Sequence, residues 1–544
     1  MSSFHHCSAI VLYCFLSLFV SSKGQEDTNF TSSFLWISDI HLEPDYGTPQ
    51  AINHHNHNEQ CTLTSANETF PYGQFGCDAP MLLVEQTLNH AQQVAAEKGG
   101  VDFIIASGDF CRHGNEFVDN PLQSTQEIIE TVIEMVQSRF PGVPILVTVG
   151  NNDLVPDYYI DVEETDNNTM LELVTTAFND TFISEQEVSS FRNGAYFSRN
   201  ISDTLTIISI NTIIYSREHS PDQQNIEDPF GQFVWLKDQL EFAQTAGRRV
   251  WIVGHIAPTI GSYAHDNLWH APYMTRYYDI IKEYFPSVIG GQLFGHLHTD
   301  EFRLAHDVYS SDFDLFMLRK YPLYIASSFT SIYGSNPSFR LVTYDVDRAD
   351  LLDYDTYYFN VSNPTIPPDW IKSPSFRESF DVPDMSRESL RSIINRLAAE
   401  SANKTNSLWE TFISRQSIYS PPEMGPCLDQ ICRKEWVCTL SSIFEDQYEE
   451  CVVDTWNPWE HSSVSVPFAL VAASVAVVIV LLGCIWKIRR CLLVRRNYEI
   501  QYDDDEHLQD EDDNFESHRQ SMVEITSGES AAATDDFIDV PEIT

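Results

Sequence analysis

The sequence predicts an α/β domain, because apolar strand-like runs alternate with amphipathic helices along the chain. The first strands are expected at 34–38, 101–107 and 144–149, separated by helices at 81–98 and 122–139. A β-α-β-α order of this kind builds a layered domain in which the carboxyl ends of the strands gather at one edge. We expect the functional site in the loops at that edge.

The rest of the chain continues the alternation and then changes character. Strands are expected at 195–197, 205–210, 249–253 and 287–294, and helices at 233–245 and 273–284. Short strands dominate 315–359, which predicts a second sheet packed on the first. The acidic segment 157–181 is expected to be an exposed excursion, and the helical pattern of 386–454 predicts a helical C-terminal region.

The charge of the chain restricts its partners. The formal net charge of the 544 residues is -47 at pH 7. Binding to nucleic acid or to an anionic lipid surface is therefore not expected. An anionic substrate would have to be attracted by the local positive charge of bound metal ions.

Two apolar segments near the ends of the chain predict a membrane-anchored protein of the secretory pathway. Residues 1–24 hold an apolar core followed by small and polar residues, which is typical of a signal peptide; the alternative is a buried N-terminal helix. Residues 464–486 carry no charge, are long enough to cross a bilayer and precede several Lys and Arg residues. We expect a single-pass type I protein in a lysosome-like or vacuolar compartment or at the cell surface, with its catalytic body lumenal or extracellular.

The expected organisation follows from this topology. The predicted segments are a signal peptide 1–24, a catalytic domain 25–360, a helical disulfide-containing region 361–463, a transmembrane helix 464–486 and an acidic cytoplasmic tail 487–544. The tail has few large apolar side chains and cannot bury a core, so we expect it to be disordered.

Glycosylation motifs and cysteines agree with a lumenal body. Seven Asn-X-Ser/Thr triplets, the acceptor motif for N-glycosylation, lie between the two apolar segments and begin at Asn29, Asn67, Asn167, Asn179, Asn200, Asn360 and Asn403. Seven cysteines lie in the same body. An oxidising compartment permits disulfides, and the odd number leaves at least one thiol unpaired unless it crosslinks to another chain. The four cysteines between 427 and 451 are predicted to form two local bridges.

Seven potential metal ligands follow directly after apolar, strand-like runs. They are Asp39, His41, Asp109, Asn151, His255, His296 and His298. Two histidines one residue apart on an extended chain point to the same side, so His296 and His298 can face one site. The set describes a two-metal hydrolytic centre, in which the carboxylate of Asp109 is the natural bridge because it has two oxygens to share.

The ligand types also indicate the metal. Imidazole and carboxamide ligands suit borderline metals better than calcium, and no cysteine pair at zinc-finger spacing competes, so we expect two divalent cations and favour zinc. Each motif alone is more often structural, but the order and spacing of all five favour the metal centre. The histidines of the polar loop 43–76, His54, His55 and His57, are interpreted as part of a solvated insertion.

The ordered motifs resemble those of the calcineurin-like metallophosphoesterases. They are Asp39-Ile-His41, Gly108-Asp109, Gly150-Asn151, Gly254-His255 and Gly295-His296-Leu297-His298. The resemblance covers residues 34–344 and implies a sandwich of two mixed β-sheets flanked by helices.

Within that superfamily the chain is similar to the acid sphingomyelinase-like phosphodiesterases. Three stretches carry this narrower resemblance: 72–80, 333–340 and the C-terminal cysteines. It implies the disulfides Cys61–Cys77, Cys427–Cys432 and Cys438–Cys451. It also leaves Cys111 free, either as a buried small hydrophobic group or as a group sensitive to oxidation.

The resemblance further implies residue roles. One metal would be held by Asp39, His41, Asp109 and His298, and the other by Asp109, Asn151, His255 and His296. His113 matches a histidine that protonates the leaving group while a metal-bound hydroxide attacks phosphorus; alternatively, it hydrogen-bonds structure. Many relatives have a second histidine where this chain has Asn152. The run Gly150-Asn-Asn-Asp153 is instead similar to vacuolar endopolyphosphatases, so Asn152 is a candidate catalytic residue that shifts the preference toward phosphoanhydrides.

These observations predict a membrane-anchored phosphoric ester hydrolase that cleaves phosphodiesters or phosphoanhydrides, such as nucleotides or polyphosphate. Two alternatives stay open. The protein could hydrolyse sphingomyelin, although Asp39 follows the predicted signal peptide too closely for the saposin-like domain with which acid sphingomyelinase extracts lipid. It could instead be a catalytically silent type I receptor with the same fold, an idea against which the complete ligand set counts.

Overall fold

The computed structural model describes residues 30–48, 70–306, 320–362, 365, 367–400, 407–420, 427 and 429–453. The predicted signal peptide, transmembrane segment and acidic tail lie outside these residues. Among the helices of the described ranges, none is both long and apolar enough to cross a bilayer.

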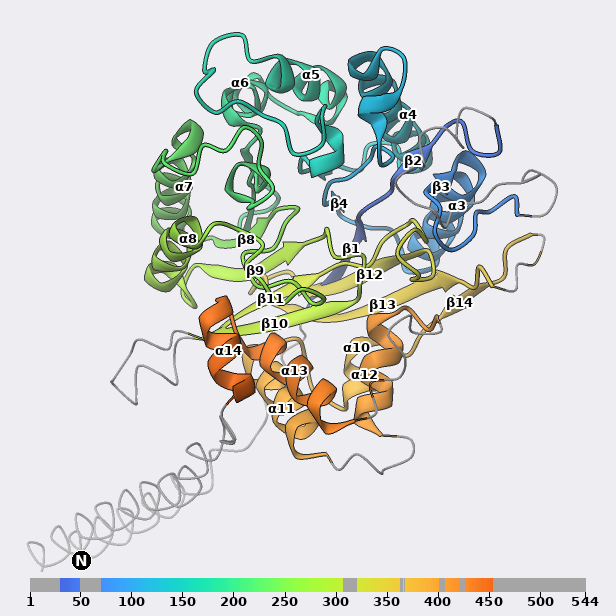
Figure 1. Cartoon of the computed structure of the whole chain (residues 1–544), viewed down its shortest axis with the longest axis vertical. Helices are drawn as coiled ribbons and strands as arrows, with labels where there is room; N and C mark the ends of the chain where they lie inside the picture. Colours follow the sequence, from blue (N-terminus) through green and yellow to red (C-terminus); the bar gives the residue numbers. More distant parts are fainter. Residues whose placement is uncertain are drawn as a thin grey trace, which may run out of the picture. The chain divides into compact units, whose positions relative to one another are not determined.

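Two mixed sheets form the centre of the fold (Figure 1), as the family resemblance implies, and each has six strands. Across the first sheet the order is β14 (Trp370–Lys372), β13 (Leu351–Phe359), β12 (Ser338–Asp345), β1 (Thr31–Ile37), β4 (Ile104–Ala106) and β5 (Ile145–Val147). Strands β1, β4 and β5 run parallel, and β12 pairs antiparallel with β1. A further short pair joins β2 (Leu42–Glu43) to β3 (Ala79–Pro80).

The second sheet is also mixed but places its parallel strands at the centre. Its order is β10 (Glu301–His306), β11 (Lys320–Ile325), β9 (Ile289–Phe294), β8 (Arg249–Val253), β7 (Leu205–Ser209) and β6 (Phe197–Asn200). The four central strands run parallel, and the two edge strands are antiparallel to their neighbours. Each sheet therefore contains a parallel group whose carboxyl ends can carry ligands.

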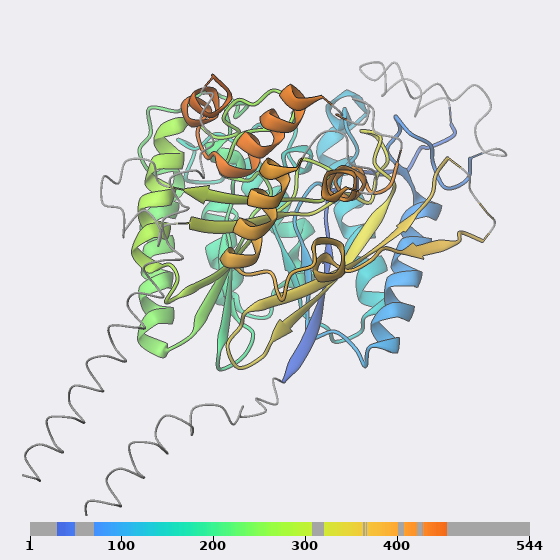
Figure 2. The same ribbon diagram turned by 90° about the horizontal axis from the view of Figure 1, so that it is seen from below.

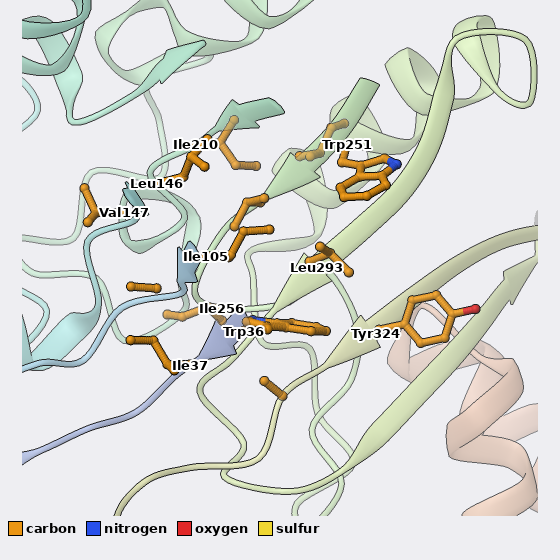
Figure 3. Close-up of a cluster of buried hydrophobic side chains, with 14 of the residues drawn as sticks. Trp36, Ile37, Ile105, Leu146, Val147, Ile210, Trp251, Ile256, Leu293 and Tyr324 are labelled. Carbon is orange, nitrogen blue, oxygen red and sulfur yellow. The ribbon is translucent and has the colours of Figure 1, made fainter. Parts of the chain in front are cut away.

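The main core lies between the two sheets (Figure 3). Phe34 and Trp36 lie two residues apart on β1 and so share one face of the strand. The ring of Phe34 lies 5.3 Å from that of Trp251 on β8, which joins the two sheets directly. Burial of such large aromatic and branched side chains is the dominant stabilising contribution in a layered fold.

Helices cover the outer faces of the sandwich (Figure 1). On the first sheet lie α3 (Met81–Glu97) and α4 (Pro121–Arg139), and on the second lie α7 (Gln232–Ala246) and α8 (Ala271–Tyr284). All four match the helices predicted from periodicity, with small shifts at their ends. Two smaller helices follow: α5 (Thr169–Ala177) packs against α4, and α6 (Glu185–Gly194) packs against α5.

The C-terminal region is helical, as predicted, and packs on strands of both sheets (Figures 1 and 2). It consists of α10 (Phe376–Phe380), α11 (Arg387–Ala399), α12 (Leu408–Gln416), α13 (Gln430–Ser441) and α14 (Glu445–Val453). Two disulfides confirm the predicted local bridges, Cys427–Cys432 and Cys438–Cys451. The second of these ties α14 to α13.

The prediction that 315–359 forms the second sheet is wrong in part. Only β11 of that stretch joins the second sheet, whereas β12 and β13 extend the first. Val342 of β12 pairs with Phe34 of β1, more than three hundred positions earlier in the chain. An apolar strand has the same period in either sheet, so periodicity does not tell which one it joins.

Two smaller expectations are also corrected. Residues 157–181 are not exposed throughout, because α5 lies within them and buries Met170, Leu171 and Val174. Most acidic residues of this segment precede α5, and within the helix only Glu172 is acidic. The strand expected at 195–197 begins only at Phe197, because Ala195, the residue that caps the end of α6, is in the left-handed conformation with φ 58°.

Candidate metal centre

The parallel strands of both sheets bring the predicted ligands together. Asp39 and His41 follow β1, Asp109 follows β4 and Asn151 follows β5, while β8 and β9 lead to the three remaining histidines. The ligand atoms form two overlapping groups, in each of which all atoms lie within 4.8 Å of one another: Asp39, His41, Asp109 and His298, and Asp109, His255 and His296. Only Asp109 belongs to both.

Distances within the cluster show why Asp109 is shared. Its Oδ2 lies 3.4 Å from His41 Nε2 and 3.2 Å from His255 Nε2. His298 Nε2 lies 3.2 Å from His41 Nε2 and 3.4 Å from Asp39 Oδ1. One carboxylate oxygen thus stands between the two groups, as a bridging ligand requires.

The carboxamide of Asn151 completes the second group. Its Oδ1 lies 3.0 Å from His255 Nε2, and its Nδ2 donates to Asp157 Oδ1 at 2.9 Å. The bond to Asp157 fixes which end of the amide faces the cluster. Burial, followed by the charge of Asp109, raises the pKa of Asp157 to about 7.

Glycines before the ligands allow this close approach. A Cβ atom on Gly150 would lie 2.1 Å from Asp109 Oδ1, and one on Gly295 would lie 2.2 Å from Ser38 Oγ. Real Cβ atoms do not come so close to other heavy atoms. The Gly-ligand pairs of the sequence are therefore a steric requirement of packing five loops around one point.

The ligand backbones are strained. Five of the seven predicted ligands have positive φ: Asp39 49°, His41 44°, Asp109 57°, His296 73° and His298 59°. Non-glycine residues in this region cost on the order of 1–3 kcal/mol each and gather at functional sites, where surrounding structure holds them. Asp153 supplies part of that support, because its carboxylate accepts hydrogen bonds from the backbone amides of Gly150, Asp109, Phe110 and Cys111.

The protonation pattern suits metal ions. His41 Nδ1 donates to the carbonyl oxygen of Cys111 at 2.9 Å, and burial lowers the pKa of this histidine to about 4. Its Nε2 lone pair therefore points at the Asp109 carboxylate and at His298, whose pKa burial holds well below the usual range. Acceptors facing one another at such distances repel unless a cation lies between them. The cluster is able to hold metal ions.

His255 is oriented in the same way. Its Nδ1 donates to the carbonyl oxygen of Ser107 at 2.8 Å, which turns Nε2 toward Asp109. Burial lowers its pKa, but the charge of Asp109 outweighs burial and raises the pKa to about 9. A metal ion at this position would displace the Nε2 proton.

His113 lies beside the cluster and is held by two groups that the sequence does not reveal. Its Nδ1 donates to Asp78 Oδ1 at 2.9 Å, and its Nε2 lies 3.1 Å from the hydroxyl of Tyr333. Its ring stacks on His41 at 4.1 Å between centroids. Burial lowers the pKa of His113, but the charge and hydrogen bond of Asp78 outweigh burial and raise it to about 9. The imidazolium can therefore donate a proton at neutral and acidic pH.

Asn152 contacts the shared carboxylate. Its backbone amide donates to Asp109 Oδ1 at 2.9 Å, and its Nδ2 donates to Oδ2 at 3.1 Å. The side chain is buried, with 4% of its surface exposed. The structure thus brings Asn152 to the bridge between the two groups, where it orients Asp109.

The other predicted sites are placed as follows. Asn167, Asn179 and Asn200 are exposed and Asn360 is half-buried, so the three exposed ones are accessible to glycosylation; the acceptors Asn29, Asn67 and Asn403 lie outside the described residues. Cys77 is disulfide-bonded, and its predicted partner Cys61 lies outside the described residues. Cys111 is a free, buried thiol.

Three residues of the site are missed by sequence reasoning: Asp78, Asp157 and Tyr333. Asp78 and Tyr333 fall in the stretches 72–80 and 333–340, which resemble a known family, but nothing local assigns them a role. Their contacts to His113 join segments 35 and 220 residues apart in the chain. Asp157 lies six residues beyond Asn151, in a segment that its acidic composition predicts to be exposed.

Comparison with known proteins agrees with this geometry. Residues 32–300 match the family model of the calcineurin-like phosphoesterases, and residues 321–457 match that of the acid sphingomyelin phosphodiesterase C-terminal region. Together the two matches cover most of the chain.

Three curated relatives match more than half of this chain, two of them over most of their own length. Sphingomyelinase phosphodiesterase D of Dictyostelium discoideum is 29% identical over 440 residues, which are 76% of this chain and 94% of that protein. Human acid sphingomyelinase-like phosphodiesterase 3b is 25% identical over 432 residues, or 77% of this chain and 90% of that protein. The endopolyphosphatase of Schizosaccharomyces pombe is 30% identical over 341 residues, or 59% of this chain and 56% of that protein. The chain is therefore an enzyme of the calcineurin-like phosphoesterases that carries the C-terminal region of the acid sphingomyelin phosphodiesterases.

Proposed function

We propose that the protein is a membrane-anchored hydrolase of phosphodiesters or phosphoanhydrides that uses two zinc ions in a lumenal or extracellular site. The observation that carries the proposal is the pair of acceptor groups that share Asp109, with the proton donor His113 stacked beside them. A bridged pair of cation sites next to a protonated imidazole is the arrangement that an in-line displacement at phosphorus needs.

The ligands divide between the two ions. Asp39, His41, Asp109 and His298 would hold one, and Asp109, Asn151, His255 and His296 would hold the other. When bound, the ions supply Lewis acidity toward a phosphoryl oxygen and an activated water for attack. Imidazole, carboxylate and carboxamide donors favour zinc over calcium or magnesium.

The protein side chains manage the proton and the orientation of the bridge. His113 donates the proton on Nε2 to the departing oxygen, while Asp78 keeps the positive charge on the ring by accepting from Nδ1. The hydroxyl of Tyr333 lies 3.1 Å from Nε2, the atom from which the proton would leave. Asn152 holds the two oxygens of Asp109 in place.

The relatives support two substrate classes. The Dictyostelium and human relatives are named phosphodiesterases, and the Schizosaccharomyces pombe relative is named an endopolyphosphatase. Asn152, in the run Gly150-Asn-Asn-Asp153, favours phosphoanhydrides such as polyphosphate or nucleotides, whose leaving groups need less protonation. Hydrolysis of sphingomyelin is the second candidate, which the name of the Dictyostelium relative supports.

The proposed location is the secretory pathway, with the single span at 464–486 as anchor. The exposed side chains of Asn167, Asn179 and Asn200 and the two C-terminal disulfides support an oxidising, glycosylating compartment. The cell surface and a lysosome-like or vacuolar compartment fit equally. A silent receptor is disfavoured because all seven predicted ligands come together in one cluster.

A substrate panel tests the proposal. The purified full chain is assayed at pH 5 with zinc or with chelator on ATP, long-chain polyphosphate, bis-p-nitrophenyl phosphate and sphingomyelin micelles. Chelator-sensitive cleavage of ATP or polyphosphate is expected. Cleavage of sphingomyelin alone would make the lipid the substrate, and no turnover with both metals bound would make the protein a receptor.

A further inference from the structure

The ring of His298 is held differently from those of the other buried ligands. His41 and His255 each fix their rings by donating from Nδ1 to a backbone carbonyl oxygen. The Nδ1 of His298 is buried and has no hydrogen-bond partner among the described residues. Second partners of this kind normally set the orientation of a metal-binding histidine. The position of His298 must therefore be set largely by its backbone and by the rings packed on it.

That backbone is strained and is anchored on the side that follows the histidine. His298 has φ 59°, and the loop leads through Asp300 into β10. The amide of Asp300 donates to the carbonyl oxygen of Gln416 at 3.2 Å. Gln416 is the last residue of α12, so a helix of the C-terminal region contacts the ligand loop directly.

The side chain of Asp300 makes the stronger anchor. Its Oδ2 accepts from Arg415 at 3.0 Å, and its Oδ1 accepts from the hydroxyl of Tyr354 at 2.5 Å and forms an ion pair with Arg340 at 2.7 Å. Arg340, Tyr354 and Arg415 are each at most 2% exposed. This Asp300 network joins strands of the first sheet, a loop of the second and helix α12.

Arg415 in turn is fixed at its other end. Its Nη1 donates to the carbonyl oxygen of Pro374 at 2.7 Å and to the hydroxyl of Ser379 at 2.9 Å, and its guanidinium lies over the ring of Tyr354 at 5.2 Å. A buried ion pair is weak evidence for stability, because desolvation offsets much of the attraction. Its position next to a strained ligand loop therefore points to a positioning role.

We infer that Arg415, acting through Asp300, is a positioning residue for the metal ligand His298, and that the C-terminal helical region is thereby part of the support of the metal centre. The inference rests on the proposal that the cluster binds two metal ions. Of the two groups, only the one with Asp39, His41, Asp109 and His298 contains the dependent ligand. Disturbing Arg415 should therefore weaken one metal site and leave the other nearly intact.

The test is zinc titration of the chelator-stripped full chain in competition with a chromophoric chelator. The unaltered protein is expected to bind two ions. Loss of a direct outer partner of a ligand weakens metal binding by about 10- to 100-fold. Because Arg415 acts one step further away, through Asp300, Arg415→Met should weaken one of the two binding steps by up to about 10-fold, and Arg415→Lys should restore part of it. The loss should not add to that of His298→Ala, since both act on the same ligand.

A matched control is available at the opposite edge of the second sheet. Arg199 on β6 is 3% exposed, pairs with Glu187 and donates to the carbonyl oxygens of Ile145 and Thr181. Arg199→Met removes an equally buried arginine that contacts no ligand loop. It should lower thermal stability without changing either zinc affinity.

The outcomes separate the inference from the function on which it rests. Fewer than two zinc ions on the unaltered protein would overturn the proposed metal centre itself. Two ions on the unaltered protein with both affinities unchanged in Arg415→Met, or equal losses in Arg415→Met and Arg199→Met, would overturn the positioning role. If Arg415→Met does not fold, Tyr354→Phe removes only the hydroxyl that binds Asp300. It should weaken the same single step, and an unchanged titration would again reject the inference.

Discussion

Asp78 binds His113 twice, because each of its carboxylate oxygens accepts one hydrogen bond at 2.9 Å, Oδ1 from the ring Nδ1 and Oδ2 from the backbone amide. The side chain of Asp78 is fully buried, whereas that of His113 is 25% exposed. A buried negative charge thus faces Nδ1 of the imidazolium, and the hydroxyl of Tyr333 faces Nε2. The dyad fixes both the position and the charge of His113, the proposed proton donor.

Replacing Asp78 with Asn should move the alkaline limit of activity to lower pH. In the unaltered protein Asp78 raises the pKa of His113 to about 9, so the ring keeps its proton as pH rises toward that value. Without the carboxylate, burial still lowers the pKa, and the proton is lost at lower pH. Profiles of kcat/KM from pH 5 to 10 measure the limit. Superimposable profiles would show that His113 does not supply the essential proton.

Replacing His113 with Ala should reduce turnover in a way that depends on the leaving group. General acid catalysis contributes about 10²–10⁴-fold, so kcat for an alkyl phosphodiester should fall by that amount. p-Nitrophenyl esters leave without protonation and should lose much less. Steady-state kinetics on both substrates check the difference, and equal losses would remove His113 from the acid role.

Replacing Asp109 with Asn should affect both metal sites at once. Its Oδ2 lies within 3.4 Å of His41 Nε2 and His255 Nε2, so a neutral amide removes the charge that both groups share. Metal content by mass spectrometry and turnover should both collapse, while circular dichroism stays native. A folded variant with full activity would contradict the assignment of the bridge.

Cys111 should be inert in the native protein. Its thiol is buried, and burial together with the charges of Asp153 and Asp109 raises its pKa well above the usual value. The thiolate that reacts with iodoacetamide is therefore scarce. Mass spectrometry should detect labelling only after denaturation, with activity unchanged by the reagent. Rapid labelling of the folded chain would instead make Cys111 an oxidation-sensitive group.

Sequence reasoning identifies the side chains that form the buried cluster because their signal is local. Each of Asp39, Asp109, Asn151 and His255 follows an apolar run within a few residues, and the shared direction of parallel strands brings such ends together. The glycines stand next to these residues in the sequence, but the crowding that requires them comes from other loops, as when Gly150 approaches Asp109.

The same reasoning fails where the information lies in distant pairing. Asp78 can bind His113 only because the fold brings β3 beside the loop after β4. Tyr333 reaches the site only because its loop folds back over His298. The strand partner of β12 and the burial of α5 are likewise tertiary choices, which composition and period leave undetermined.

The two ligand groups each draw from both sheets. The loops after β1, β4 and β5 belong to the first sheet, and those after β8 and β9 to the second, so 257 residues separate His41 from His298. Metal ions bound there would link the two sheets. They would close a chain loop far longer than the loops that the two described disulfides close. The midpoint temperature of thermal unfolding should therefore rise with free zinc concentration. Zinc binding would stabilise the sandwich and complete the proposed catalytic centre in the same step.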